Sequence, residues 1–392
     1  MRFLLDPEQR AFADSLNAML TAADTPSVVR AWSRGEHTSG RALWRRIAEA
    51  GVFALAIPEA HEGLGPRPVE LAVGFVELGR HVVPGPVVET VAAAALLTAL
   101  DDSAPAKRLL PALASGESTA TLATGRYALD ADFADVRLTA RAARAARGPM
   151  GRTATEPAVE PEAAGRQVFG AGGSASRAGG SAAEPRGASL PGDAPPAAEL
   201  RLGPPPGHGP SAAGPRASLD PARRLFPTPT GGELLAVGPH VTAAVAHALT
   251  WARLATAAQA LGVGLALLDR TVAYVKQRSQ FGVPVGSFQA VKHQLADAKV
   301  ALEFARPMIF GAALTMTESD VAAAKVTACE AAYRTARTAL QLHGAIGYTA
   351  EYDLSLWLTK ARALRGSWGS PGACRAAVLG VFGDVSGGGR RS

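Results

Sequence analysis

The stretch RSQFGVPVGSFQAVKHQLADAKVALEFAR, residues 278–306, decides the fold of this chain. Its Gly-Val-Pro-Val-Gly break interrupts a helical spacing of apolar residues that continues on both sides, because glycine and proline end helices. The pattern predicts one helix over 241–277 and a second over 287–314. Two helices of this length joined by a tight corner are typical of a four-helix bundle.

The corner itself carries side chains that a bundle does not require. Arg278, Gln280 and Phe281 stand where a guanidinium and a phenyl ring reach outward. A guanidinium suits a bidentate grip on phosphate, and a flat apolar ring suits contact with a base or a sugar. The alternative is a solvated arginine and a packing phenylalanine at a helix end, and these residues taken alone favour that alternative.

A second stretch, ALQLHGAIGYTAEYDLSLWLTKARAL, residues 339–364, resembles a helix end followed by a new helix. Gly344 and Gly347 end a helix predicted over 321–343 and allow close approach of the backbone, while Gln341 projects from its last turn. Further helices are predicted over 352–364 and after Pro371.

The composition narrows the class of protein. At 392 residues with 47% hydrophobic residues, the chain is long enough for two or three globular domains. The net charge is +6, but the arginines are spread widely, which argues against a nucleic-acid partner. Cys329 and Cys374 stand alone, so we expect packing thiols and neither a disulfide framework nor a metal site.

The chain divides into regions of different character. Residues 1–115 read as an all-helical domain that begins with an amphipathic helix rather than a signal peptide. No run of eighteen apolar residues occurs, so we expect no membrane span and a cytoplasmic location. Residues 238–385 form the predicted helical bundle, and 386–392 a disordered tail.

The middle region, residues 116–237, reads as a remnant β domain. Between 138 and 217 the sequence is almost entirely Ala, Arg, Gly, Pro, Ser and Glu, without alternation of period two, and it is predicted to be largely disordered. Two short strands are expected at 225–226 and 234–235, on either side of a Thr-Gly-Gly turn. We hypothesise that 138–217 is a displaced reading frame of a GC-rich gene.

RSQFGVPVGSFQAVKHQLAD, followed further along by QLHGAIGYTAEYDL, resembles the carboxy-terminal half of the acyl-CoA dehydrogenase family. DPEQRAFADSL and GVFALAIPEAHEGLG are similar to the first domain of the same family. The resemblance implies a mainly α fold in which two helical domains flank a small β-barrel, with the degenerate or disordered middle segment standing in the barrel's place. It also implies an acyl-CoA substrate, FAD at a subunit interface, a tetramer and an electron-transfer flavoprotein as acceptor.

The resemblance also assigns cofactor contacts. Arg278 and Phe281 match positions that contact the pyrophosphate and adenosine end of an FAD bound mainly to the neighbouring subunit. Gln341 and Gly344 match another part of that contact. The outward-pointing corner is then half of a shared dinucleotide site.

The catalytic residues of the family are missing at their usual places. Dehydrogenation of an acyl thioester needs a base for the α-proton, and a carboxylate in a dry pocket suits this. The usual glutamate precedes a Gly-Ser step that matches Gly369-Ser370, which puts Trp368 at its position. The alternative base position, just ahead of Arg253, holds Ala252. TLATGRYALDAD also replaces the flavin-contacting Thr-Glu-Pro loop.

Three functions remain open from the sequence. The first is an active FAD-dependent dehydrogenase with an unrecognised base. The second is a catalytically deficient subunit that completes the FAD site of an active partner in a hetero-oligomer, which the loss of both base positions favours. The third is a polyanion-binding protein that uses the segment ARAARAARG, which lacks the interleaved aromatic residues of a nucleic-acid site.

Overall fold

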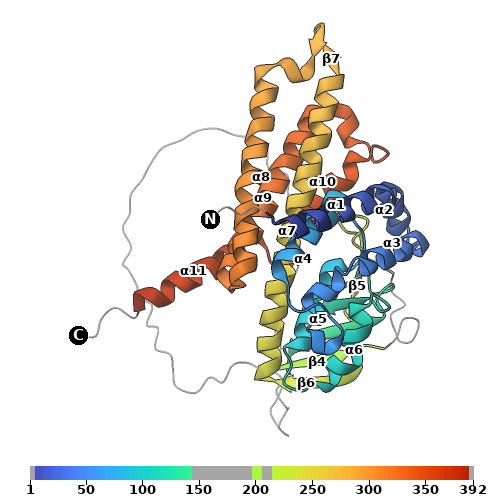
Figure 1. Cartoon of the computed structure of the whole chain (residues 1–392), viewed down its shortest axis with the longest axis vertical. Helices are drawn as coiled ribbons and strands as arrows, with labels where there is room; N and C mark the ends of the chain where they lie inside the picture. The colour runs from blue at the N-terminus through green and yellow to red at the C-terminus, as the bar shows by residue number, and fades with distance from the viewer. Residues whose placement is uncertain (1–4, 144–196, 205–213, 388–392) are drawn as a thin grey trace, which may run out of the picture.

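The computed structural model describes residues 5–143, 197–204 and 214–387. Two long helices rise to a corner at the tip of the molecule, with the amino-terminal helices beside their lower half and the small sheets beneath these (Figure 1). The mainly α architecture predicted from the sequence is confirmed in this part of the chain.

The amino-terminal helices follow the apolar periodicity of the sequence. They are α1 (Pro7–Thr21), α2 (Thr25–Ser33), α3 (Thr38–Glu49), α4 (Pro68–Arg80), α5 (Val87–Thr98) and α6 (Ala104–Ala114), with the 3₁₀ turns η1 (Phe53–Ala56) and η2 (Glu59–His61). Asp6 and Gln9 form a capping box that starts α1, with Asp6 Oδ1 accepting from the Gln9 backbone at 2.8 Å. Almost every residue of α5 is buried, so this helix forms the centre of the domain.

The middle region contains a four-stranded sheet in the order β1-β3-β4-β6. Its strands are β1 (Ala120–Ala123), β3 (Val136–Ala142), β4 (Ala198–Leu202) and β6 (Glu233–Gly238). The pair β1 and β3 is parallel, and the other pairs are antiparallel. A separate pair joins β2 (Tyr127–Leu129) to β5 (Leu225–Pro227).

The prediction of disorder over 138–217 is wrong for the parts that the structure describes. Leu138 and Ala140 of β3, with Leu200 of β4, are buried in the main core. Small side chains suffice here because ladder bonds from strands remote in sequence order the backbone, which local composition does not reveal. The rest of that prediction, and most of the reading-frame hypothesis, concerns residues 144–196 and 205–213. These lie outside the described residues.

The two strands predicted around the Thr-Gly-Gly stretch both form, but they do not pair with each other. β5 pairs with β2, and β6 pairs with β4. Gly232, at a φ of 100°, comes so close to β4 that an added Cβ would lie 2.2 Å from the Leu202 carbonyl oxygen. The glycine therefore permits a close approach between strands, and it does not make a hairpin turn.

The predicted bundle is present, with helix ends displaced by a few residues. It comprises α7 (Pro239–Gln277), α8 (Gln289–Thr315), α9 (Glu318–His343), α10 (Leu354–Gly366) and α11 (Pro371–Gly387), with the turns η3 (Val285–Ser287) and η4 (Gly344–Tyr348). The corner between α7 and α8 is a short hairpin of β7 (Ser279–Gln280) and β8 (Val283–Pro284). α11 continues past residue 385, the predicted end of the bundle.

Helix α7 forms the core of the molecule. Among the described helices it alone is long and apolar enough to cross a membrane, yet its most apolar window is entirely buried inside the protein, as expected of a core helix. It crosses α4 at Gly79 and Gly262, where an added Cβ would lie 2.1 Å from the Gln259 carbonyl oxygen and 1.9 Å from that of Val76. This close crossing fixes the first domain on the bundle.

Candidate functional site

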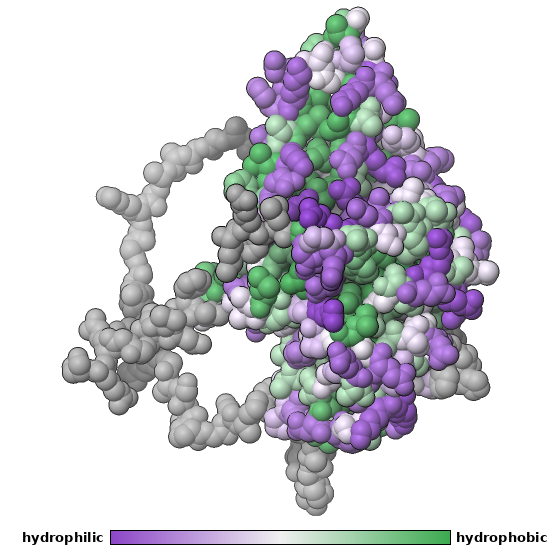
Figure 2. All heavy atoms as spheres, viewed as in Figure 1, coloured by the Kyte–Doolittle hydropathy of each residue, from purple (hydrophilic) through white to green (hydrophobic). Residues whose placement is uncertain are grey.

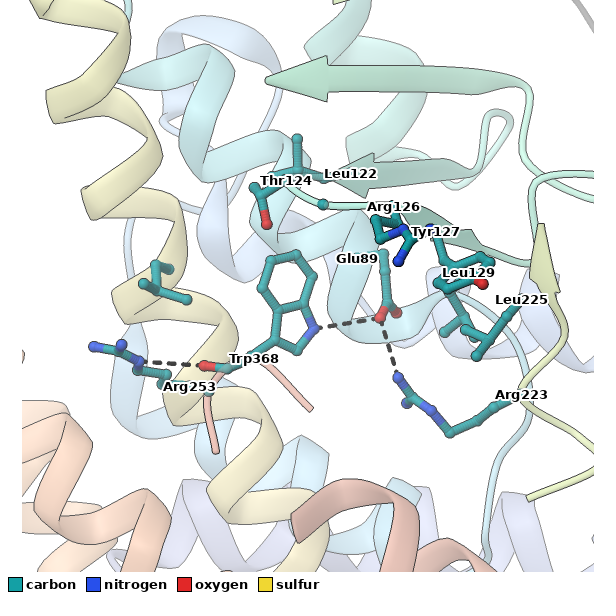
Figure 3. A pocket seen from close by; sticks show the side chains of 13 residues that line it. Glu89, Leu122, Thr124, Arg126, Tyr127, Leu129, Arg223, Leu225, Arg253 and Trp368 are labelled. Carbon is teal, nitrogen blue, oxygen red and sulfur yellow. Dashed lines mark hydrogen bonds and ion pairs between the residues drawn. The ribbon is translucent and has the colours of Figure 1, made fainter. Parts of the chain in front are cut away.

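A pocket of about 480 Å³ opens where the first domain, the strands and the bundle meet (Figure 3). Its walls come from α5, the β1–β2 segment, the chain before β5, α7 and the loop after α10. They are lined by Glu89, Leu122, Thr124, Gly125, Arg126, Tyr127, Leu129, Arg223, Leu225, Leu249, Arg253, Trp368 and Gly369. Segments distant in sequence thus combine three guanidinium groups, one carboxylate and an indole.

Glu89 is the one carboxylate among these lining residues, and it is 3% exposed. Its Oε1 accepts a hydrogen bond from Trp368 Nε1 at 3.3 Å and lies 3.7 Å from Arg223 Nη2 (Figure 3). Burial raises the pKa of Glu89 above its usual value, although Arg223 and the indole N–H both favour the ionised form. Its Oε2 is buried without a hydrogen-bond partner in the described part of the chain.

The Trp368 side chain is held toward Glu89 by its own backbone. Trp368 has a φ of 54°, a left-handed conformation, and its carbonyl oxygen accepts from Arg253 Nε at 3.3 Å. Arg253 is in turn paired with Glu318 at 3.0 Å. Lys325 is fully buried and donates to the carbonyl oxygens of Gly369 and, at 2.9 Å, of Arg365. Two cations therefore fix the loop that carries the indole.

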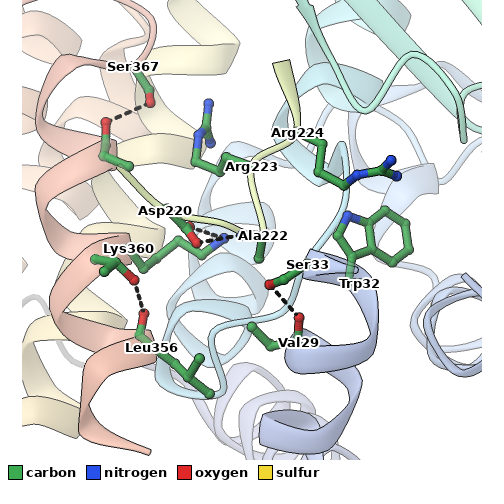
Figure 4. Close-up of polar contacts among 12 residues, drawn as sticks. Val29, Trp32, Ser33, Asp220, Ala222, Arg223, Arg224, Leu356, Lys360 and Ser367 are labelled. Carbon is green, nitrogen blue, oxygen red and sulfur yellow. Dashed lines mark hydrogen bonds and ion pairs between the residues drawn. The ribbon is translucent and has the colours of Figure 1, made fainter. Parts of the chain in front are cut away.

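Arg223 reaches the pocket from a segment that is anchored on both sides (Figure 4). Asp220, just before it, forms an ion pair of 3.2 Å with Lys360 of α10, and both side chains are almost completely buried. The following residue, Arg224, accepts at its carbonyl oxygen from the Asp130 backbone N–H at 2.7 Å. Its own backbone N–H donates to Asp130 Oδ1 at 3.3 Å, and the Trp32 indole donates to the same oxygen at 3.1 Å. The segment is therefore clamped between the first domain and α10.

The two positions at which a base was expected lie in different surroundings. Trp368 lines the pocket, whereas Ala252 is fully buried inside α7 and is not among the lining residues. Sequence reasoning missed Glu89, although one feature identifies it. It is the only Asp, Glu, Lys or Arg between Arg80 and Asp101, in a helix whose other residues are uncharged and mostly apolar.

The predicted cofactor contacts lie outside this pocket. Arg278 and Phe281 are exposed at the α7–α8 corner, where Phe281 has 91% exposure and a φ of 55°. The Phe281 ring lies edge-on to Phe288, with 6.3 Å between centroids. Among the described residues, no hydrogen bond or ion pair reaches the Arg278 guanidinium, so both groups are available to a ligand or to another chain.

Gln341 and Gly344 lie together in a second, larger cavity. Gly344 ends α9 at a φ of 63°, as predicted, and both residues line a groove of about 920 Å³. Arg334 and Arg337 add positive charge to its wall. Arg278 and Phe281 are not among its lining residues, so one chain brings together two of the four predicted contacts. The assignment of all four to FAD stays a prediction.

The cysteines fit the role expected for them. Cys329 and Cys374 are both buried and free, and burial raises the pKa of Cys329 to about 12. A thiol with so high a pKa is uncharged and unreactive at neutral pH. Within the described ranges, no cluster of three His, Cys, Asp or Glu residues could hold a metal ion.

Two helical domains around a small sheet, with a pocket at their junction, define the class of acyl-CoA dehydrogenase folds. The models of that family's N-terminal and C-terminal domains match residues 6–117 and 242–375, and together these matches cover most of the chain. The protein belongs to the acyl-CoA dehydrogenase family, whose members are FAD-dependent oxidoreductases.

Related proteins cover the chain almost end to end. Acyl-CoA dehydrogenase IpdE2 of Mycobacterium tuberculosis is 29% identical over 360 residues, which is 91% of each chain. The ChsE4-ChsE5 complex of Mycobacterium tuberculosis shares the fold at a TM-score of 0.70 and 20% identity, over 100% of both chains. A glutaryl-CoA dehydrogenase from Mycobacterium smegmatis in complex with FADH2 does so at 0.71 and 15%, over 96% of this chain and 95% of its own.

Proposed function

We propose that the protein is a cytoplasmic FAD-dependent dehydrogenase that introduces an α,β double bond into an acyl-CoA thioester. The observation that carries this proposal is the pocket lined by Glu89 and Trp368, called the junction pocket because the three regions of the fold meet there. In it, the buried carboxylate of Glu89 stands beside Trp368, the residue matched to the family's usual base position. A pocket walled by all three regions of the fold can enclose an acyl chain and exclude water. An electron-transfer flavoprotein would be the electron acceptor.

The exposed residues of the bundle fit FAD. The guanidinium of Arg278, which has no partner among the described residues, has the donor geometry for a pyrophosphate, and the ring of Phe281 offers an apolar face to the adenosine. No atom of the described residues lies within 4 Å of a Cβ built on Gly344, so the backbone beside Gln341 is open to a ligand. When bound, FAD supplies the two-electron oxidation for which the side chains of this chain have no chemistry.

Association with another subunit is supported by the surface of α8. Val300, Phe304 and Met308 are spaced four residues apart and are 52%, 70% and 39% exposed, so they form an apolar stripe along one helix face. Hydrophobic residues also reach the surface in the upper part of the bundle and at its tip (Figure 2). We propose a homo- or hetero-tetramer in which a neighbouring chain covers these surfaces.

A second candidate function is a catalytically deficient partner subunit that completes the FAD site of an active acyl-CoA dehydrogenase. The observation that favours it is the occupation of both usual base positions, one by Trp368 and the other by Ala252. Neither an indole nor a methyl group can accept a proton. The name of the ChsE4-ChsE5 complex describes two different subunits in a protein of this fold.

One experiment separates these candidates. The protein is purified alone and together with the products of neighbouring genes, and the flavin absorbance is recorded before and after addition of acyl-CoA. Yellow protein that is bleached by an acyl-CoA in the absence of partners supports the first candidate. Colourless protein that gains flavin only in a complex supports the second.

Substitutions at the corner test the cofactor contact. Arg278→Ala with Phe281→Ala should lower the flavin content of the purified assembly and leave folding intact, because both side chains are exposed. Arg34→Ala, which removes an exposed arginine paired with Glu36, serves as the control and should retain the flavin. Full flavin content in the double variant would refute the assignment of Arg278 and Phe281.

A further inference from the structure

One oxygen of the junction pocket has no partner in the described part of the protein. Glu89 is 3% exposed, and while its Oε1 accepts from Trp368 and faces Arg223, its Oε2 is buried and unsatisfied. Leaving a buried acceptor unpaired destabilises the protein, because the oxygen has lost its water without gaining a donor. Such a group in the wall of a cavity points to a ligand that completes it.

We infer that Glu89 is the proton acceptor of this pocket, which removes the α-proton of an acyl thioester in place of the base missing at Trp368. The inference rests on the first proposed function. It assigns a base on α5 of the first domain, a place that neither the sequence motifs nor the family resemblance indicated.

Position is the first argument for this role. Trp368 occupies the usual base position, and its indole nitrogen lies 3.3 Å from Glu89, so the carboxylate stands one side chain away from that position. The lining residues include no other carboxylate and no histidine. Glu89 is therefore the one group among them with the chemistry of a general base at neutral pH.

The surrounding charges suit a base that must remain ionisable although its side chain is buried. Burial raises the pKa of Glu89, which strengthens its hold on a proton, while Arg223, the indole N–H and Lys360 favour the carboxylate. The acidic group that interacts electrostatically with Glu89 is the carboxyl of Asp130. The remaining charged groups that line the pocket are the guanidinium groups of Arg126 and Arg253.

The proposed step balances in atoms and electrons. The α-carbon to hydrogen bond breaks, and a new O–H bond forms on Glu89. The electron pair left on the α-carbon would form the double bond as the β-hydrogen leaves with its own pair as a hydride, and FAD, when bound, would supply the two-electron oxidation. The product is a 2-enoyl thioester, and the proton on Glu89 later returns to solvent.

Glu89→Gln tests the assignment in the flavin-loaded protein. Glutamine keeps the size of the side chain and an oxygen that can accept the Trp368 N–H, so the fold should persist. Butanoyl-, octanoyl- and hexadecanoyl-CoA are each incubated in D₂O. Deuterium at the α-carbon is measured by mass spectrometry, and flavin bleaching is measured in parallel. We expect both rates to fall about 10²- to 10⁴-fold, the usual contribution of a general base.

Two further variants make the result specific. Glu77→Gln is the matched control, because Glu77 of α4 is also a mostly buried glutamate whose pKa burial raises, but it does not line the pocket. It should retain the exchange rate of the wild type. Trp368→Glu combined with Glu89→Gln returns a carboxylate to the usual base position, and it should recover α-proton exchange that Glu89→Gln alone has lost.

The outcomes separate this inference from the function on which it rests. If the wild type shows flavin bleaching and α-proton exchange, and both persist unchanged in Glu89→Gln, the role of Glu89 is overturned. The dehydrogenase function then still stands. A wild-type protein that neither exchanges nor is bleached with any of the three thioesters overturns both. An equal loss in Glu77→Gln would show general damage to the fold and also overturn the assignment.

Discussion

The indole of Trp368 and the carboxylate of Glu89 meet at 3.3 Å, although 279 residues of sequence separate them. The contact joins α5 of the first domain to the loop after α10, and it stands in the wall of the junction pocket. It places a neutral hydrogen-bond donor, at the position where the sequence analysis expects the base, beside a buried carboxylate. The state of ionisation of Glu89 therefore depends on Trp368.

Trp368→Phe should raise the pKa of Glu89 further, because the lost N–H favours the carboxylate. If activity depends on this carboxylate, the acid limb of the pH–activity profile should then shift to higher pH, because Glu89 becomes protonated at a higher pH. The variant should also lose about 1–3 kcal/mol of unfolding free energy. Trp251→Phe removes an indole bond to His247 away from the pocket, so it should leave the pH profile unchanged. Identical profiles in all three proteins would contradict this coupling.

Lys360→Met should destabilise the protein by about 3–5 kcal/mol, because it leaves the buried Asp220 carboxylate without its cation. Lys360→Met with Asp220→Asn should recover much of this loss, since the uncharged amide oxygen can still accept from the Ala222 backbone. Urea unfolding of the two variants measures the difference. Equal stability of single and double variants would show that the ion pair is not what fixes this segment.

Gly262→Ala should lower stability by about 1–3 kcal/mol or more, because the added Cβ would lie 1.9 Å from the Val76 carbonyl oxygen and would push α7 away from α4. Gly366→Ala is the control, since no atom in the described part of the chain lies within 4 Å of a Cβ built there. In a helix this change should be neutral or stabilising by up to about 1 kcal/mol. Thermal unfolding compares the two, and a Gly262→Ala protein as stable as the control would contradict the close crossing.

Asp130 should give the protein a pH-dependent stability. Burial raises the pKa of Asp130 from 3.8 to about 8 in the folded state, so its contribution is fully present below pH 4 and is lost as the pH rises toward 8. Asp130→Asn removes this titration and keeps an acceptor for the Trp32 indole, and asparagine tolerates the φ of 48°. The variant's unfolding free energy, compared with that of the wild type, should change less between pH 4 and 8. An unchanged slope would show that Asp130 is ionised in the native protein.

The helical part of the fold was accessible from the sequence, because helix formation follows local periodicity and local stop residues. The corner after Gln277 and the end of α9 at Gly344 lie where glycine and the apolar pattern predicted them. The sheet was not accessible in the same way. β3 and β4 have little apolar surface of their own, and their ladder partners come from segments distant in the chain.

For the candidate site the same division holds. Sequence by itself determined the family, and it predicted the outward-pointing residues Arg278 and Phe281 and the placement of Trp368 where a base is expected. Only the tertiary structure decided that Glu89 meets that tryptophan in one pocket and that Arg223 faces the same carboxylate. The physical reason is that a carboxylate's chemistry depends on burial and on neighbouring charges, and these arise only when distant segments pack together.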